Sequence, residues 1–104
     1  MVSKKFRFPI RLIHKKPFQI IKTDFFLLKI YKNNLNINRF GVITSLKVDK
    51  KATVRNLLKR RIISIVKNFP NQSQDFLISV FPKAKTLNYN ELQENLRNLF
   101  NLNK

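Results

Sequence analysis

The side chains that could do chemistry in this sequence are mostly cations, because 22 of its 104 residues are Lys or Arg and five are Asp or Glu. No two carboxylates stand at a spacing typical of paired acid–base catalysis or of a two-metal phosphodiesterase site. The single glycine also rules out a glycine-rich phosphate loop. The sequence therefore predicts no catalytic residue and no metal ligand in this chain. The five acids are Asp24, Asp49, Asp75, Glu91 and Glu94.

The cations best placed to act together lie within residues 47–69. Arg55 and Lys59 are four residues apart, so on a helix they share one face. Asn56 and Arg60 flank them. A row of cations fixed by a helix favours an extended polyanion, such as RNA or DNA, as its partner. The alternative interpretation of the same residues is a solvated, charged helix face.

Charge and composition support a folded protein that seeks an anionic partner. The formal net charge is +17, and 43% of the residues are hydrophobic, including ten Phe. This composition indicates one packed domain over residues 1–104 rather than a disordered basic tail. Nucleic acid is the leading partner and an anionic membrane surface the second. No apolar run approaches the roughly 18 residues needed to span a bilayer. The absence of Cys fits a reducing compartment, so we expect a cytoplasmic protein.

Hydrophobic periodicity predicts the elements that position these cations. Residues 52–69 have the three-and-four apolar spacing of an amphipathic helix, which Pro70 ends. Asn88 and Glu91 form a capping box for a second helix that runs to about residue 102. A further helix of about two turns is predicted after Pro9, and residues 82–87 are predicted to be a basic loop. The expected strands are residues 17–22, 25–32, 40–44 and 76–81.

These elements predict a two-layer α/β sandwich of the α+β class, in the order short helix, three strands, basic helix, strand and helix. The strand at 25–32 is apolar on both faces, which is typical of a central strand. A short Asn-rich connection joins it to the strand at 40–44, so the two are predicted to pair antiparallel. Gly41 lies within that third strand and indicates a close backbone approach or a bulge.

At this point the chain resembles the protein subunit of bacterial ribonuclease P, over roughly residues 24–100. The family pattern has an Arg-x-Gly-Ile strand, a Ser-Lys-Lys loop and a helix with an Arg-Asn-Arg-x-Lys-Arg core. Two departures replace family cations: Leu46 in the loop and Leu57 in the helix. We expect Leu57, being apolar, to turn toward the core. The residues that carry the resemblance are Arg39-Phe40-Gly41-Val42, Ser45-Leu46-Lys47-Val48, Arg55-Asn56-Leu57-Leu58-Lys59-Arg60 and Asp75-Phe76-Leu77-Ile78.

The resemblance implies a role as well as a fold. The strand–helix–strand crossover around the basic helix would be left-handed, against the usual rule. The chain would bind the catalytic RNA, in a 1:1 complex, and the single-stranded 5′ leader of precursor tRNA. The RNA would carry the chemistry and hold most of the Mg²⁺, with no small-molecule substrate and no membrane involved. Phe18 and Phe25 are candidates for the leader cleft. The implied RNA-binding residues are Arg39, Lys47, Lys50, Lys51, Arg55, Asn56, Lys59 and Arg60.

Three other functions stay open from the residues alone. A ribosomal or other structured-RNA-binding module, or a DNA-binding module, could carry the same basic helix. An autonomous nuclease would cut RNA without an RNA partner, but the shortage of acids argues against it. A membrane-surface peptide would lack a cooperative thermal transition in the absence of lipid.

Overall fold

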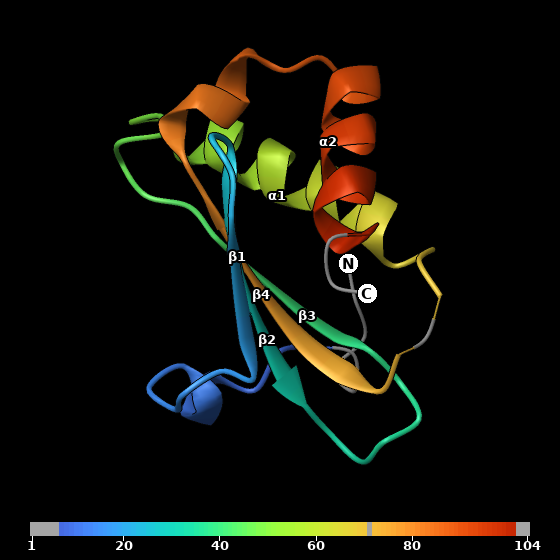
Figure 1. The fold of residues 1–104 in the computed structure, drawn as a ribbon. Coiled ribbons are helices and arrows are strands. Elements are labelled where there is room, and N and C mark those ends of the chain that lie inside the picture. The colour runs from blue at the N-terminus through green and yellow to red at the C-terminus, as the bar shows by residue number, and fades with distance from the viewer. Residues whose placement is uncertain (1–6, 71, 102–104) are drawn as a thin grey trace.

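The computed structural model describes residues 7–70 and 72–101. This part of the chain contains four strands, two α-helices and two short 3₁₀ helices. Figure 1 shows how they are arranged. The observed order matches the predicted one. In chain order the elements are η2 (Ile10–Leu12), β1 (Gln19–Lys22), β2 (Phe26–Lys32), β3 (Arg39–Ile43), α1 (Ala52–Val66), β4 (Gln74–Val80), η3 (Pro82–Thr86) and α2 (Tyr89–Asn101).

The four strands form one sheet in the order β1-β2-β4-β3. β2 pairs antiparallel with both β1 and β4, which confirms its central place. The predicted antiparallel pair of β2 and β3 is wrong, because β4 lies between them and pairs parallel with β3. The apolar, largely buried β4 takes an interior position, and the long crossover through α1 makes the parallel pairing possible. The left-handed sense of this crossover stays a prediction.

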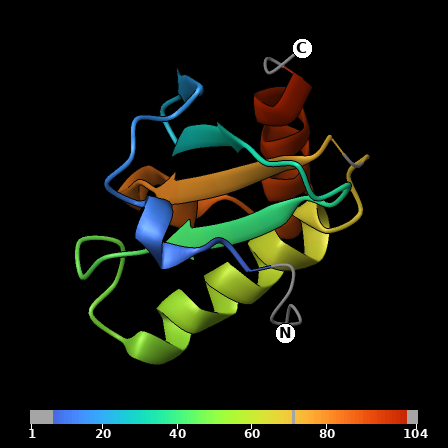
Figure 2. The same ribbon diagram turned by 90° about the horizontal axis from the view of Figure 1, so that it is seen from below.

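Both α-helices cover one face of the sheet, which confirms the two-layer sandwich (Figures 1 and 2). The strands contribute alternate residues to this core, such as Phe26, Leu28 and Ile30 of β2. The predicted apolar face of α2 is buried throughout. It consists of Leu92, Leu96, Leu99 and Phe100.

The buried residues of the basic helix all lie in its second half. The fully covered residues of α1 are Ile62, Ile65 and Val66. Leu57 is 43% exposed, so the prediction that it turns toward the core is wrong. In the first half of the helix the neighbouring Leu58 packs against the main core as a partly buried residue, whereas Leu57 stays at the surface.

Local signals predicted the start of α2 correctly. The Asn88 backbone N–H donates to Glu91 Oε1 at 2.9 Å, and the Glu91 N–H donates to Asn88 Oδ1 at 2.8 Å. This is the reciprocal capping box. The predicted loop at 82–87 instead contains the 3₁₀ turn η3, which begins at Pro82 and buries Ala84 completely. Proline at the first position of a helical turn loses no hydrogen bond, which favours this turn.

The N-terminal segment packs against the face of the sheet opposite the helices. Phe8 lies in a small second core with Tyr31 and Leu77, and its ring centroid is 5.3 Å from that of Tyr31. The Phe8 N–H donates to the Phe40 carbonyl at 2.9 Å, which attaches the segment to the edge of β3. The predicted two-turn helix is wrong, since only the single turn η2 forms after an extended Pro9.

Gly41 is the point at which this segment approaches the sheet, as its position in a strand indicated. A Cβ atom added at Gly41 would lie 2.8 Å from Phe8 Cβ and 3.2 Å from Leu77 Cδ1. We expect Gly41→Ala to lower the free energy of unfolding by about 1–3 kcal/mol, because the segment would have to move outward. Urea denaturation measures the change. Gly41 does not have positive φ, so without this clash the substitution would stabilise the protein, and a stabilised variant would contradict the packing described here.

Candidate nucleic-acid interface

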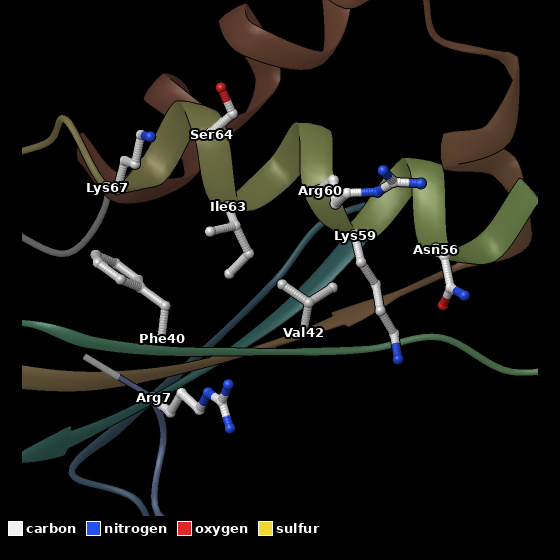
Figure 3. A pocket seen from close by; sticks show the side chains of 9 residues that line it. All are labelled: Arg7, Phe40, Val42, Asn56, Lys59, Arg60, Ile63, Ser64 and Lys67. Carbon is white, nitrogen blue, oxygen red and sulfur yellow. The ribbon is translucent and has the colours of Figure 1, made fainter. Parts of the chain in front are cut away.

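A groove runs between α1 and the edge strand β3, with a volume of about 760 Å³ (Figure 3). Its floor is apolar and its rims are cationic. Phe40 and Val42 rise from β3 toward Ile63 of α1, and Lys59 extends from the helix toward the strand. The full lining is Arg7, Phe40, Val42, Asn56, Lys59, Arg60, Ile63, Ser64 and Lys67.

The helical wall follows directly from the spacing of its residues. Asn56, Lys59 and Ile63 recur every three or four positions, so they lie along one face of α1, and Lys67 at the C-cap continues the row. The adjacent face of the helix enters the core. One amphipathic helix thus fixes a row of polar groups against the sheet, and backbone geometry rather than a flexible tail sets their separation.

The structure separates Arg55 from the residues with which the sequence grouped it. Its Nη1 atom donates to the backbone carbonyl of Asp49 at 2.9 Å and to that of Lys50 at 3.0 Å. Asn56, Lys59 and Arg60 line the groove, whereas Arg55 does not. Arg55 therefore joins the helix to the loop that precedes it.

The loop before α1 presents the predicted lysines at the surface. Lys47, Lys50 and Lys51 are all exposed, while Val48 between them is only 3% exposed and joins the main core. Burial of Val48 holds the middle of the loop against the protein. The three ammonium groups therefore project from a segment with a fixed anchor.

Arg39 lies apart from the groove and has a structural partner. Its guanidinium donates from Nε and Nη2 to the two carboxylate oxygens of Asp75, at 2.7 and 2.6 Å. Asn33 donates to the same carboxylate at 2.8 Å. Asp75 is completely buried, and register places it directly beside Arg39 across the β3–β4 pair. This bidentate pair joins the parallel strands on the sheet face opposite the helices.

The two aromatic candidates lie elsewhere on the surface. Phe18 precedes the other edge strand, β1, and is 58% exposed, with Lys32 Nζ 4.2 Å from its ring centroid. Phe25 packs against the main core beside Phe26, and Lys83 lies over its ring. Neither lines the groove between α1 and β3, whose aromatic residue is Phe40.

Sequence reasoning missed six residues of the groove, among them Phe40, which was noted only as part of the strand motif. Ser64 and Lys67 continue the helical spacing beyond Arg60, so extending the same face by one turn would have identified them. Arg7 and Val42 enter through tertiary structure: the N-terminal segment bridges to Phe40 in a parallel pairing. Ile63 faces the groove although its spacing also fits the apolar stripe.

Within residues 7–70 and 72–101, no group of three or more His, Cys, Asp or Glu side chains could hold a metal ion. Nor does any helix of that part of the chain have the length and apolar character needed to cross a bilayer. The lining of the groove itself offers cations, the hydrogen-bonding side chains of Asn56 and Ser64, and an apolar floor.

Fold and groove together define a small, strongly basic α+β domain of the type that binds nucleic acids. A family model described as Ribonuclease P matches residues 10–103. The match extends over most of the sequence, and the chain belongs to the ribonuclease P protein family, as the Arg-Asn-x-x-Lys-Arg core of its basic helix indicated.

Relatives in other organisms agree with this assignment. A ribonuclease P protein component from Synechocystis sp. is 42% identical over 66 residues, which are 61% of this chain and 53% of the relative. The component from Pseudanabaena sp. is 34% identical over 73 residues, covering 67% of this chain and 63% of the relative. The matched segments thus span less than two thirds of either relative.

Solved structures support the same fold. The RNase P protein of Staphylococcus aureus superposes with a TM-score of 0.77 at 21% identity, covering 95% of each chain. The RNase P protein of Thermotoga maritima superposes with a TM-score of 0.76 at 27% identity, covering 89% of this chain and 93% of the other.

Proposed function

We propose that this chain is the protein component of a ribonuclease P ribonucleoprotein, in which it binds the catalytic RNA and the 5′ leader of precursor tRNA. It acts in a 1:1 complex in the cytoplasm and promotes RNA-catalysed removal of the leader. The observation that carries the proposal is the groove between α1 and β3. Its cationic rims and apolar floor belong to a member of the ribonuclease P protein family.

The groove suits a single strand of nucleic acid. Lys59, Arg60 and Lys67 neutralise phosphates along the helix, and Asn56 offers hydrogen bonds to a phosphate or a base edge. The floor formed by Phe40, Val42 and Ile63 has no side-chain donor or acceptor, so it contacts sugars and bases without reading their sequence. That combination fits a leader, whose sequence differs among precursor tRNAs.

The loop before the helix is assigned to the catalytic RNA. Lys47, Lys50 and Lys51 are exposed and lie at the N-terminal end of α1, where the helix dipole also favours a phosphate. Arg39 is left out of this proposal because Asp75 already pairs with two of its donor atoms. Phe18 and Phe25 are left out of the leader site because the groove does not include them.

The chemistry belongs to the RNA in this proposal. The described carboxylates stand apart from one another or serve ion pairs and a helix cap, so they do not form a donor set for Mg²⁺. In this proposal the Mg²⁺ is held mainly by the RNA. The protein lowers the repulsion between two polyanions and so reduces the Mg²⁺ concentration that the reaction needs.

Reconstitution tests the proposal. The protein is added to a bacterial ribonuclease P RNA at low Mg²⁺, and cleavage of a precursor tRNA is followed. We expect cleavage at the 5′ leader at a Mg²⁺ concentration where the RNA alone is nearly inactive. A protein that binds this RNA yet leaves cleavage unchanged would instead support a structured-RNA-binding module, and cleavage by the protein alone would indicate an autonomous nuclease.

A further inference from the structure

An acidic residue lies among the lysines of the loop that precedes α1. Asp49 is surrounded in sequence by Lys47, Lys50 and Lys51, which are all exposed. For a surface that binds a polyanion, one carboxylate at this place should weaken binding on charge alone. The contacts of Asp49 indicate how a carboxylate at this position could nevertheless support RNA binding.

Each oxygen atom of the Asp49 carboxylate has a partner. Its Oδ2 atom lies 2.6 Å from Lys85 Nζ of η3, and its Oδ1 atom accepts the Lys51 backbone N–H at 2.8 Å. The hydrogen bond from Lys85, followed by that from the Lys51 backbone, lowers the pKa of Asp49 below its usual range. The side chain is only 15% exposed. The ion pair between Asp24 and Lys83 is looser, at 3.6 Å with 79% and 63% exposure.

The contact joins two distant segments at the end of the basic helix. Figure 1 shows η3 beside the loop that leads into α1. Arg55 binds the backbone carbonyls of Asp49 and Lys50 from the helix side. The loop is thus tied to η3 through the Asp49 side chain, to α1 through its backbone and to the core through Val48.

We propose that Asp49 is a positioning residue, whose ion pair with Lys85 fixes the loop so that Lys47, Lys50 and Lys51 meet the RNA in one preset arrangement. The inference rests on the proposed function, since it concerns how the same RNA surface is organised. A pre-ordered loop binds more tightly because less side-chain and backbone freedom is lost on association.

The test compares two acid-to-amide variants with the same change in charge. Asp49→Asn and Asp24→Asn each remove one negative charge, so a purely electrostatic effect would tighten RNA binding in both. Binding to a bacterial ribonuclease P RNA is measured by filter retention over a range of salt concentrations. We expect Asp49→Asn to weaken binding about fivefold, the effect of having to order roughly one long side chain on association, whereas Asp24→Asn is unchanged or tighter.

Three further measurements separate positioning from loss of the fold. Asp49→Asn should melt within about 3 °C of wild type, because it changes one partly exposed pair. Its log affinity should depend less steeply on log salt, since a displaced loop engages fewer phosphates. Asp49→Glu should restore most of the affinity. Lys85→Met should weaken binding, and the double variant Asp49→Asn with Lys85→Met should bind no worse than the weaker single variant.

Equal or tighter binding by Asp49→Asn, in parallel with Asp24→Asn, would overturn the inference while the proposed function stands. Additive losses from Asp49→Asn and Lys85→Met would also overturn it, because independent effects exclude a shared contact. A wild-type chain that does not bind the RNA would overturn the proposed function and, with it, this inference.

Discussion

Replacing Asp75 by Ala is expected to lower the free energy of unfolding by about 3–5 kcal/mol, the range for breaking a buried ion pair on one side. Asp75 is fully buried, and the Arg39 side chain that it binds is only 15% exposed. The substitution leaves that guanidinium without its partner, removes an acceptor for Asn33 and opens a cavity between β3 and β4. Urea denaturation followed by circular dichroism gives the change.

The matched control is Asp24→Ala, which removes the acid of an exposed, loose ion pair. We expect a change of at most about 0.5 kcal/mol there, because exposed ion pairs contribute little. Asp75→Asn keeps one acceptor oxygen, so its loss of unfolding free energy should lie between those of Asp75→Ala and Asp24→Ala. If Asp75→Ala cost no more than Asp24→Ala, the pair with Arg39 would not hold the parallel strands together.

Replacing Lys59 and Arg60 together by Ala is expected to weaken binding of a bacterial ribonuclease P RNA carrying precursor tRNA by about two orders of magnitude at low salt. The estimate follows from two lost hydrogen bonds to charged phosphates at roughly 1.5 kcal/mol each. Neither side chain is among the buried residues of α1, so the fold should persist with an unchanged circular dichroism spectrum. Gel-shift titration measures the affinity.

Removal of two positive charges from any part of the surface lowers the affinity for RNA to some extent, because the net charge falls. The control is therefore Arg11→Ala with Lys16→Ala, which removes one Arg and one Lys from exposed positions in and after η2. The η2 segment packs through Leu12 against the small second core of Phe8, Tyr31 and Leu77, whereas α1 packs into the main core. Equal losses from the two double variants would show that net charge, rather than the groove, determines binding.

Features that depend on neighbours in sequence could be predicted. The capping box of Asn88 and Glu91 and the apolar face of α2 each need only local spacing, and both are present. The central position of β2 followed from its apolar run. The helix that carries Asn56, Lys59 and Arg60 was also predicted correctly, because its apolar spacing is a local feature of the sequence.

Features that depend on distant partners could not be predicted. A strand that enters between two earlier ones leaves no local signal, so the β4 insertion was missed and β2 was wrongly paired with β3. Arg39 appeared as a free cation in the sequence because its partner, Asp75, is far along the chain. Leu57 follows the helical spacing, but the extent of packing along α1 decides its exposure.

The salt dependence of RNA binding tests most directly whether the groove between α1 and β3 contacts RNA. The slope of log affinity against log salt counts the phosphates that the protein neutralises. For Lys59→Ala with Arg60→Ala, we predict that the slope decreases in magnitude by about two relative to wild type. For Arg11→Ala with Lys16→Ala, we predict the wild-type slope. A groove variant whose slope equals that of wild type would contradict the assignment of these cations to the RNA-binding face.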